Sequence, residues 1–90
     1  MIALPDGYVL GMSKREVRDS ARAMLADDWR VDVYHNGRPA FKLAKQWKFD
    51  EYSPEYAGML HGVTDTWHRS KDLHELIAIM CTKHRIGVGR

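Results

Sequence analysis

The clearest helical pattern in the chain begins at residue 13. Ser13 and Glu16 have the spacing of a capping box, in which two side chains satisfy free amides at the start of a helix. The apolar residues that follow recur with a period near 3.6, at Val17, Ala21, Met24 and Leu25. The acidic pair at 27–28 is unfavourable at the negative end of a helix dipole. We therefore expect a helix from Ser13 to about Ala26.

Strict alternation of apolar and polar residues then predicts a β-hairpin over residues 29–43, with His35-Asn36-Gly37 at its turn. A two-residue turn of Asn36 and Gly37 leaves Phe41 and Leu43 on the face away from the core. A three-residue turn, with Gly37 in the left-handed conformation and a bulge, brings both to the core face. We therefore expect the three-residue turn. Its predicted pairs are Val31 with Phe41 and Trp29 with Leu43.

Two shorter elements flank these predictions. The apolar pattern continues through Trp47 and Phe49, so the strand either bends onward or breaks into a third strand over 46–49, which we favour. Near the start, Pro5-Asp6-Gly7 separates two short apolar stretches and is typical of a turn. We expect a short β arm there.

Two further helices are predicted in the second half. Ser53-Pro54-Glu55 combines an N-cap, a first-turn proline and an acid. The apolar stripe of this helix is Tyr56, Met59, Leu60, Val63 and Trp67. Ser70 is the expected cap of the last helix, which has Asp72 in its first turn and runs to about Lys83. Apolar side chains cover well over half of this helix, at Leu73, Leu76, Ile77, Ile79, Met80 and Cys81.

These elements predict one α+β domain over residues 1–90, in which an antiparallel hairpin or three-stranded sheet packs against three helices in the order α-β-β-(β)-α-α. A chain of 90 residues that is 44% hydrophobic has enough apolar surface for one core. The single cysteine excludes an intramolecular disulfide. Because neither a signal-like start nor an apolar run of about 18 residues is present, we expect a cytoplasmic protein outside the membrane.

Residues that commonly carry catalysis or bind metals do not form a diagnostic motif. His61 and His68 would stand about 10.5 Å apart along the second helix, too far to share one metal ion. Cys81 and His84 are three residues apart, but we interpret both as part of the apolar stripe of the last helix. The chain has no nucleophile elbow or glycine-rich phosphate loop. We therefore expect no enzymatic activity, no metal and no cofactor.

Three surfaces are candidates for binding a macromolecule. The solvent face of the hairpin is basic and carries a tyrosine, which favours phosphate contact and base stacking. Its residues are Arg30, Tyr34, Arg38 and Lys42. A second basic stripe on the first helix consists of Arg15, Arg18 and Arg22. The third surface is apolar: Ile79 lies on the last helix, and Gly58 and Gly62 on the back of the second would allow another chain to approach closely.

Three general resemblances bear on function. The order of a helix, three strands and a helix resembles the double-stranded-RNA-binding fold, but Ser53-Pro54-Glu55 and Ser70-Lys71-Asp72 lack the basic cluster that such domains use on phosphates. Residues 29–63, a sheet followed by a helix, resemble small integrase-type DNA readers. A lone domain without a catalytic motif is similar to the accessory proteins with which phages inhibit host enzymes or defence complexes.

We therefore expect a non-enzymatic module that binds another protein and inhibits or regulates it. The alternative is a small nucleic-acid-binding protein that uses the hairpin face, although a net charge of +2 does not mark a polyanion binder. A small metalloprotein or enzyme subunit is the third interpretation. The broad apolar surface of the last helix also raises the hypothesis of a homodimer.

Overall fold

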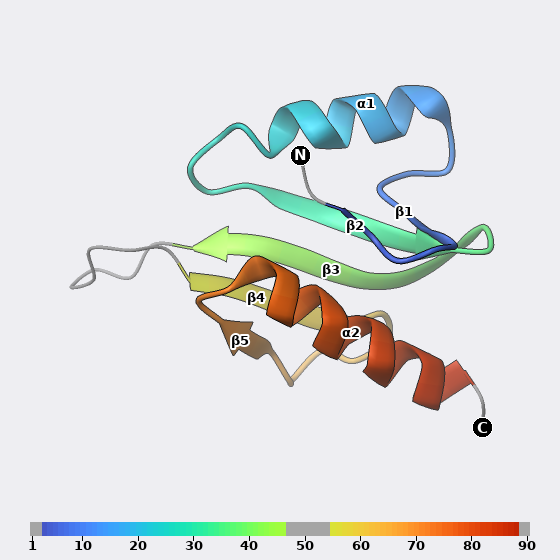
Figure 1. Cartoon of the computed structure of the whole chain (residues 1–90), viewed down its shortest axis with the longest axis vertical. Coiled ribbons are helices and arrows are strands. Elements are labelled where there is room, and N and C mark those ends of the chain that lie inside the picture. The colour runs from blue at the N-terminus through green and yellow to red at the C-terminus, as the bar shows by residue number, and fades with distance from the viewer. Residues whose placement is uncertain (1–2, 47–54, 89–90) are drawn as a thin grey trace.

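The computed structural model describes residues 3–46 and 55–88 and shows an α+β fold (Figure 1). Its elements are β1 (Tyr8–Val9), α1 (Lys14–Ala23), β2 (Arg30–His35), β3 (Arg38–Gln46), β4 (Glu55–Leu60), β5 (His68–Ser70) and α2 (Leu73–Val88). In this part of the chain, neither helix has the length and apolar character needed to cross a bilayer.

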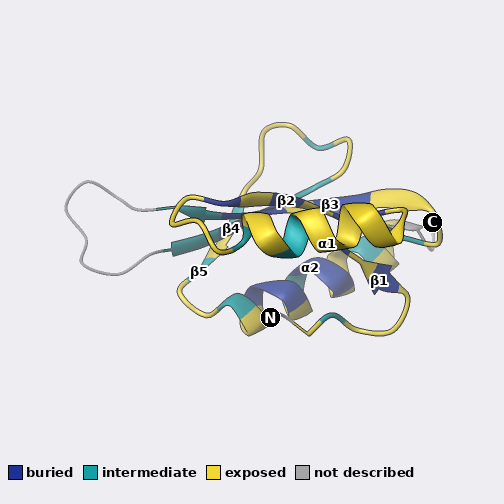
Figure 2. Ribbon diagram, turned by 90° about the horizontal axis from the view of Figure 1, so that it is seen from above, coloured by how far each residue is buried: buried dark blue, intermediate teal, exposed yellow. Residues whose placement is uncertain are grey.

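The five strands form one antiparallel sheet in which each strand pairs with its neighbours in sequence, from β1 to β5. Helix α2 lies across one face of this sheet, and α1 lies beside β2 at its edge (Figures 1 and 2). The opposite face carries no helix from the described residues. The α+β class is thus confirmed, but the described residues form five strands and two helices where a smaller sheet and three helices were predicted.

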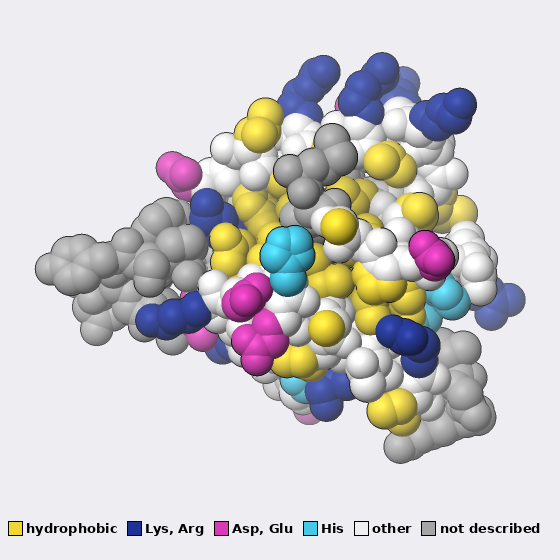
Figure 3. All heavy atoms as spheres, viewed as in Figure 1, with side chains coloured by type: hydrophobic (Ala, Val, Ile, Leu, Met, Phe, Trp, Pro, Cys, Tyr) yellow, Lys and Arg dark blue, Asp and Glu magenta, His cyan; other side chains and the backbone are white. Residues whose placement is uncertain are grey.

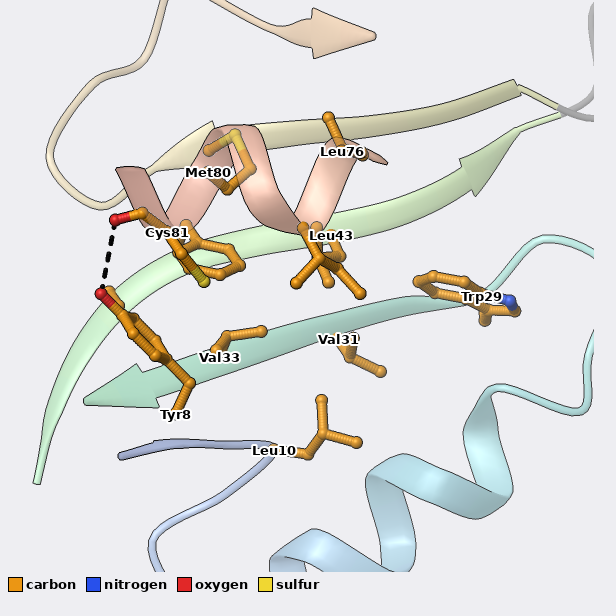
Figure 4. Close-up of a cluster of buried hydrophobic side chains, with 12 residues drawn as sticks. Tyr8, Leu10, Trp29, Val31, Val33, Leu43, Leu76, Met80 and Cys81 are labelled. Atoms are coloured by element: carbon orange, nitrogen blue, oxygen red, sulfur yellow. Dashed lines mark hydrogen bonds between the residues drawn. The ribbon is translucent and has the colours of Figure 1, made fainter. Parts of the chain in front are cut away.

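The hydrophobic core lies between the sheet and α2. The side chains of Val33, Phe41 and Leu43 point to α2, and they are at most 1% exposed. Leu76 and Met80 on α2 are equally buried, and Figure 4 shows several of these side chains converging. Alternate residues of β2 are buried in the core, as the hairpin pattern predicts.

The turn between β2 and β3 differs from the prediction. His35 pairs with Arg38, so the turn consists of Asn36 and Gly37 alone. Both turn residues have positive φ, 52° and 76° respectively. A type I′ turn requires positive φ at both central positions, and Asn-Gly is its preferred sequence. The three-residue turn is therefore wrong.

A bulge resolves the conflict that made the two-residue turn look incompatible with the core. The register shifts in β3 at Ala40, which places an additional residue between two cross-strand pairs. Phe41 thereby returns to the core face opposite Val33, and Leu43 lies opposite Val31. The predicted core residues are correct, but each predicted cross-strand pair is wrong.

The region predicted as the second helix forms β4, a connection and β5 instead. Within β4, Tyr56 and Leu60 face the same side as Gly58, which lies under α2. A Cβ atom on Gly58 would lie 2.8 Å from Cγ of Met80. Gly62 has φ +83° in the turn after β4. The two glycines therefore do not share a helix surface. Gly58 leaves space for the Met80 side chain, and Gly62 adopts the positive φ that the turn requires.

Helix α1 begins as predicted. The backbone amide of Glu16 donates to Oγ of Ser13 at 3.1 Å, and the Glu16 carboxylate accepts from the amide of Met12 at 2.6 Å. This arrangement is a variant of the capping box, in which the Glu16 carboxylate accepts from the amide one residue before the N-cap. The helix ends at Ala23, earlier than the predicted Ala26.

Helix α2 begins at a different cap from the one predicted. Oδ1 of Asp72 accepts from the amides of His74 at 2.9 Å and Glu75 at 3.2 Å, so Asp72 is the capping residue. Ser70 lies outside the helix, and its Oγ accepts from the amide of Asp72 at 3.0 Å. The helix also runs past its predicted end at Lys83.

Two other predictions concern the ends of strands. The short N-terminal arm is confirmed as β1, which pairs with the end of β2. Strand β3 continues to Gln46, whereas residues 47–49 of the predicted third strand and the predicted Ser53 cap lie outside the described residues.

The contact between Gly58 and Met80 yields a first prediction. We expect Gly58→Ala to lower the free energy of unfolding by about 1–3 kcal/mol in urea denaturation, because the added Cβ displaces Met80. Gly87→Ala is the matched control, since nothing lies within 4 Å of the Cβ position at this exposed helical glycine. It should be neutral or slightly stabilising. Equal effects of the two substitutions would contradict this packing.

Candidate binding groove

Helix α1 has an apolar face, yet none of its residues is buried. Val17 is 36% exposed, and Leu25, just beyond the helix, is 85% exposed. Figure 2 shows the contrast with α2, whose side toward the sheet is buried. An amphipathic helix normally covers its apolar stripe with the core of its own domain. Here α1 leaves much of that stripe in contact with solvent.

A groove of about 590 Å³ lies between α1 and the beginning of α2. Leu10, Trp29 and Tyr56 contribute apolar surface, and the two aromatic rings have centroids 6.0 Å apart. Leu25 lines the groove beside α1, and Leu73 lines it from α2. Figure 3 shows hydrophobic side chains gathered between the two helices, with Lys and Arg side chains along the outer edge of α1.

The polar residues that line the groove are cations or hydrogen-bond donors. They are Arg18 and Arg22 on α1, Lys45 on β3, and His74 on α2. Within the described ranges, no Asp or Glu lines it. Neither Arg18 nor Arg22 is in an ion pair with another described residue, whereas Arg15 lies 3.9 Å from Asp19. Two of the three arginines in the predicted helix stripe thus border this groove.

Trp29 belongs both to the core and to the lining of the groove. Its side chain is almost fully buried, at 5% exposed, but the indole nitrogen lies on the side away from the core cluster (Figure 4). The groove therefore combines an aromatic surface with cationic side chains.

The predicted hairpin face is only partly assembled. It comprises Arg30, Tyr34, Arg38 and Lys42. Arg30 and Lys42 lie on the face of the sheet opposite α2, but Asp32 on the same face pairs directly with Lys42. Arg38 pairs with His35, whose ring stacks on Tyr8 at the α2 side. The structure therefore separates Arg38 from the other cations and places a carboxylate among them.

The predicted apolar interface is not assembled either. Ile79 is half-buried on α2, Gly58 lies beneath Met80, and Gly62 lies in the turn after β4. The sequence patterns also missed the role of the groove residues Leu10, Trp29, Tyr56 and Leu73. Trp29 and Tyr56 were expected only to fill the core, Leu73 was assigned to the broad apolar surface of the last helix, and no role was predicted for Leu10. No local signal marks the groove that brings these residues together.

A second cluster of titratable side chains connects β1, β2 and α2. The hydroxyl of Tyr8 lies 2.9 Å from Nδ1 of His84, and its ring stacks on His35 with centroids 4.4 Å apart. The His35 and His84 rings lie 5.2 Å apart. Burial lowers the pKa of His84, and the nearby charges of His35 and Arg85 lower it further. The cluster therefore favours a neutral imidazole at residue 84.

Metal binding has little support in the described part of the chain. It contains no group of three or more His, Cys, Asp and Glu residues placed to hold an ion. Cys81 is fully buried and has a raised pKa because of that burial, while His84 contacts Tyr8.

Comparisons with protein family models, curated proteins and solved structures found no match for this chain. Function must therefore be argued from the residues of the groove.

The histidine cluster yields a pH prediction. A lowered pKa of His84 means that the unfolded state binds more protons, so stability is present above about pH 6.5 and falls as the pH decreases below it. Urea denaturation over a pH series should show this decline in the wild type. His84→Asn should flatten it, and the control His61→Asn, at an exposed residue, should not. An identical decline in His84→Asn would contradict the role of His84.

Proposed function

We propose that this protein is a non-enzymatic module that binds another protein through the groove between α1 and α2, and thereby inhibits or regulates that partner. The exposed apolar surface formed by α1 and the turn that follows it is the observation that carries this proposal. A single exposed leucine needs no explanation. Leu25, however, is 85% exposed and lines the same groove as Trp29 and Tyr56, so its surface continues that of two aromatic rings.

The composition of the groove supports a protein as the ligand. Trp, Tyr and Arg are the residue types that contribute most to binding energy at protein interfaces. Trp29, Tyr56, Arg18 and Arg22 all line this groove. Apolar patches rimmed by polar groups commonly mark sites of protein interaction. The groove fits this description better than any of the three surfaces expected from sequence.

Nucleic-acid binding through the hairpin is the alternative, and its support is weaker. Arg30 and Lys42 lie on the open sheet face, but the carboxylate of Asp32 opposes them. A phosphate-binding surface gains affinity from each uncompensated cation. We therefore treat this alternative as an outcome of the following experiment.

Capture from nuclease-treated extract of the source cells tests the proposal. Tagged wild-type protein should retain a protein partner, and Leu25→Asp should lose it, because a carboxylate in the apolar groove must be desolvated on binding. Leu25→Asp should keep the wild-type melting temperature, since the side chain it replaces is exposed. Ile86→Asp is the matched control, as Ile86 is 57% exposed at the other end of α2. It should retain the partner.

Two results would contradict the proposal. One is capture that persists in Leu25→Asp but is lost in Ile86→Asp, which would place the interface elsewhere. The other is recovery of nucleic acid alone, lost on Arg30→Glu with Lys42→Glu, which would support the alternative.

A further inference from the structure

The charge around the groove restricts what can occupy it. Arg18 and Arg22 border its apolar surface from α1, and neither has a carboxylate partner within the described residues. Lys45 and His74 also line it, so further donors face the groove. The groove thus presents cations and donors around an apolar surface. Carboxylates are the protein groups that complement both.

The apolar part of the groove restricts the occupant further. Its volume of about 590 Å³ is large enough for several side chains, and Leu10, Leu25 and Leu73 extend it around the two aromatic rings. An acidic segment without large apolar side chains would leave the apolar surface of the groove hydrated. The occupant therefore needs an apolar face and acidic flanks.

The backbone N–H and C=O groups of the occupant must also find hydrogen-bond partners. Trp29, Lys45 and Tyr56 reach the groove from strand positions that already pair within the hairpin and between β3 and β4. The backbones of Lys45 and Tyr56 are thus already engaged in the sheet, so a bound strand would find few backbone partners beside them. A helix satisfies its own backbone groups and can place apolar side chains at i, i+3, i+4 and i+7 in such a groove.

From these three constraints, and resting on the proposed function, we infer that the groove binds an acidic amphipathic helix of the partner protein. Its apolar face packs on Leu25, Tyr56 and the small exposed part of the Trp29 ring. Its carboxylates lie beside Arg18 and Arg22.

Two labelled synthetic peptides of about 14 residues, roughly four helical turns, test this inference. Both carry leucines at i, i+3, i+4 and i+7, and they differ only in having glutamate or lysine at the flanking positions. Fluorescence anisotropy should show that wild-type protein binds the glutamate peptide about tenfold or more tightly than the lysine peptide. Binding of the glutamate peptide should weaken as salt is added.

Charge reversal provides the decisive comparison. Arg18→Glu with Arg22→Glu should exchange the preference, so that the lysine peptide binds more tightly. The pair Arg38→Glu and Lys42→Glu changes the net charge equally on the hairpin and should keep the wild-type preference. If circular dichroism shows that α1 is lost in the Arg18→Glu, Arg22→Glu variant, the variant Arg18→Gln with Arg22→Gln is used instead. It should bind the glutamate and lysine peptides equally, without a reversed preference.

The outcomes separate this inference from the proposed function. Equal binding of both peptides, lost in Leu25→Asp, would refute the acidic preference while leaving the groove as a protein-binding site. Failure of wild-type protein to bind either peptide would overturn the acidic helix as occupant, and the capture experiment would then decide the proposed function by itself. The inference would also be overturned if Arg38→Glu with Lys42→Glu changed the preference for the glutamate peptide and Arg18→Glu with Arg22→Glu did not.

Discussion

The width of a helix limits how much of a sheet it can cover. Neighbouring strands lie about 4.8 Å apart and a helix with its side chains is about 10–12 Å wide, so one helix covers roughly two strands. Here α2 packs against β3, β4 and β5, where Met80 fits over Gly58. The sheet has five strands, and α1 lies at its β2 edge without burying a residue. The groove is the space that α1 and α2 leave between them.

This arrangement connects packing with the proposed function. Because α1 contributes no buried residue, its apolar face is available to a second molecule at little cost to the core of the domain. The core itself depends on α2 and the central strands, where Leu43 and Leu76 are fully buried. Substitutions at Leu25 therefore affect binding and folding separately. Trp29 belongs to both regions, since its ring borders the core and its nitrogen is directed away from it.

Local signals were predictable from the sequence, and long-range pairing was not. The capping box at Ser13 and Glu16 involves neighbouring residues only, so the start of α1 was correct. Tyr56 and Leu60, four residues apart, fit both a helical turn and two strand repeats, and only pairing with β3 distinguishes them. The bulge at Ala40 likewise has a long-range cause, because it places Phe41 on the core face of the sheet opposite Val33. The groove joins residues from both halves of the chain, which no single segment reveals.

Backbone hydrogen exchange, measured with and without the captured partner, tests the central claim that α1 is a docking element rather than part of the core. In the free protein, amides of α1 should exchange much faster than those around Leu76 and Met80 in α2, because no residue of α1 is fully buried. On binding, protection should rise in α1 and around Trp29 and remain unchanged in the turn at Gly37. Protection of α1 equal to that of α2 in the free protein, or no change in α1 on binding, would contradict the account.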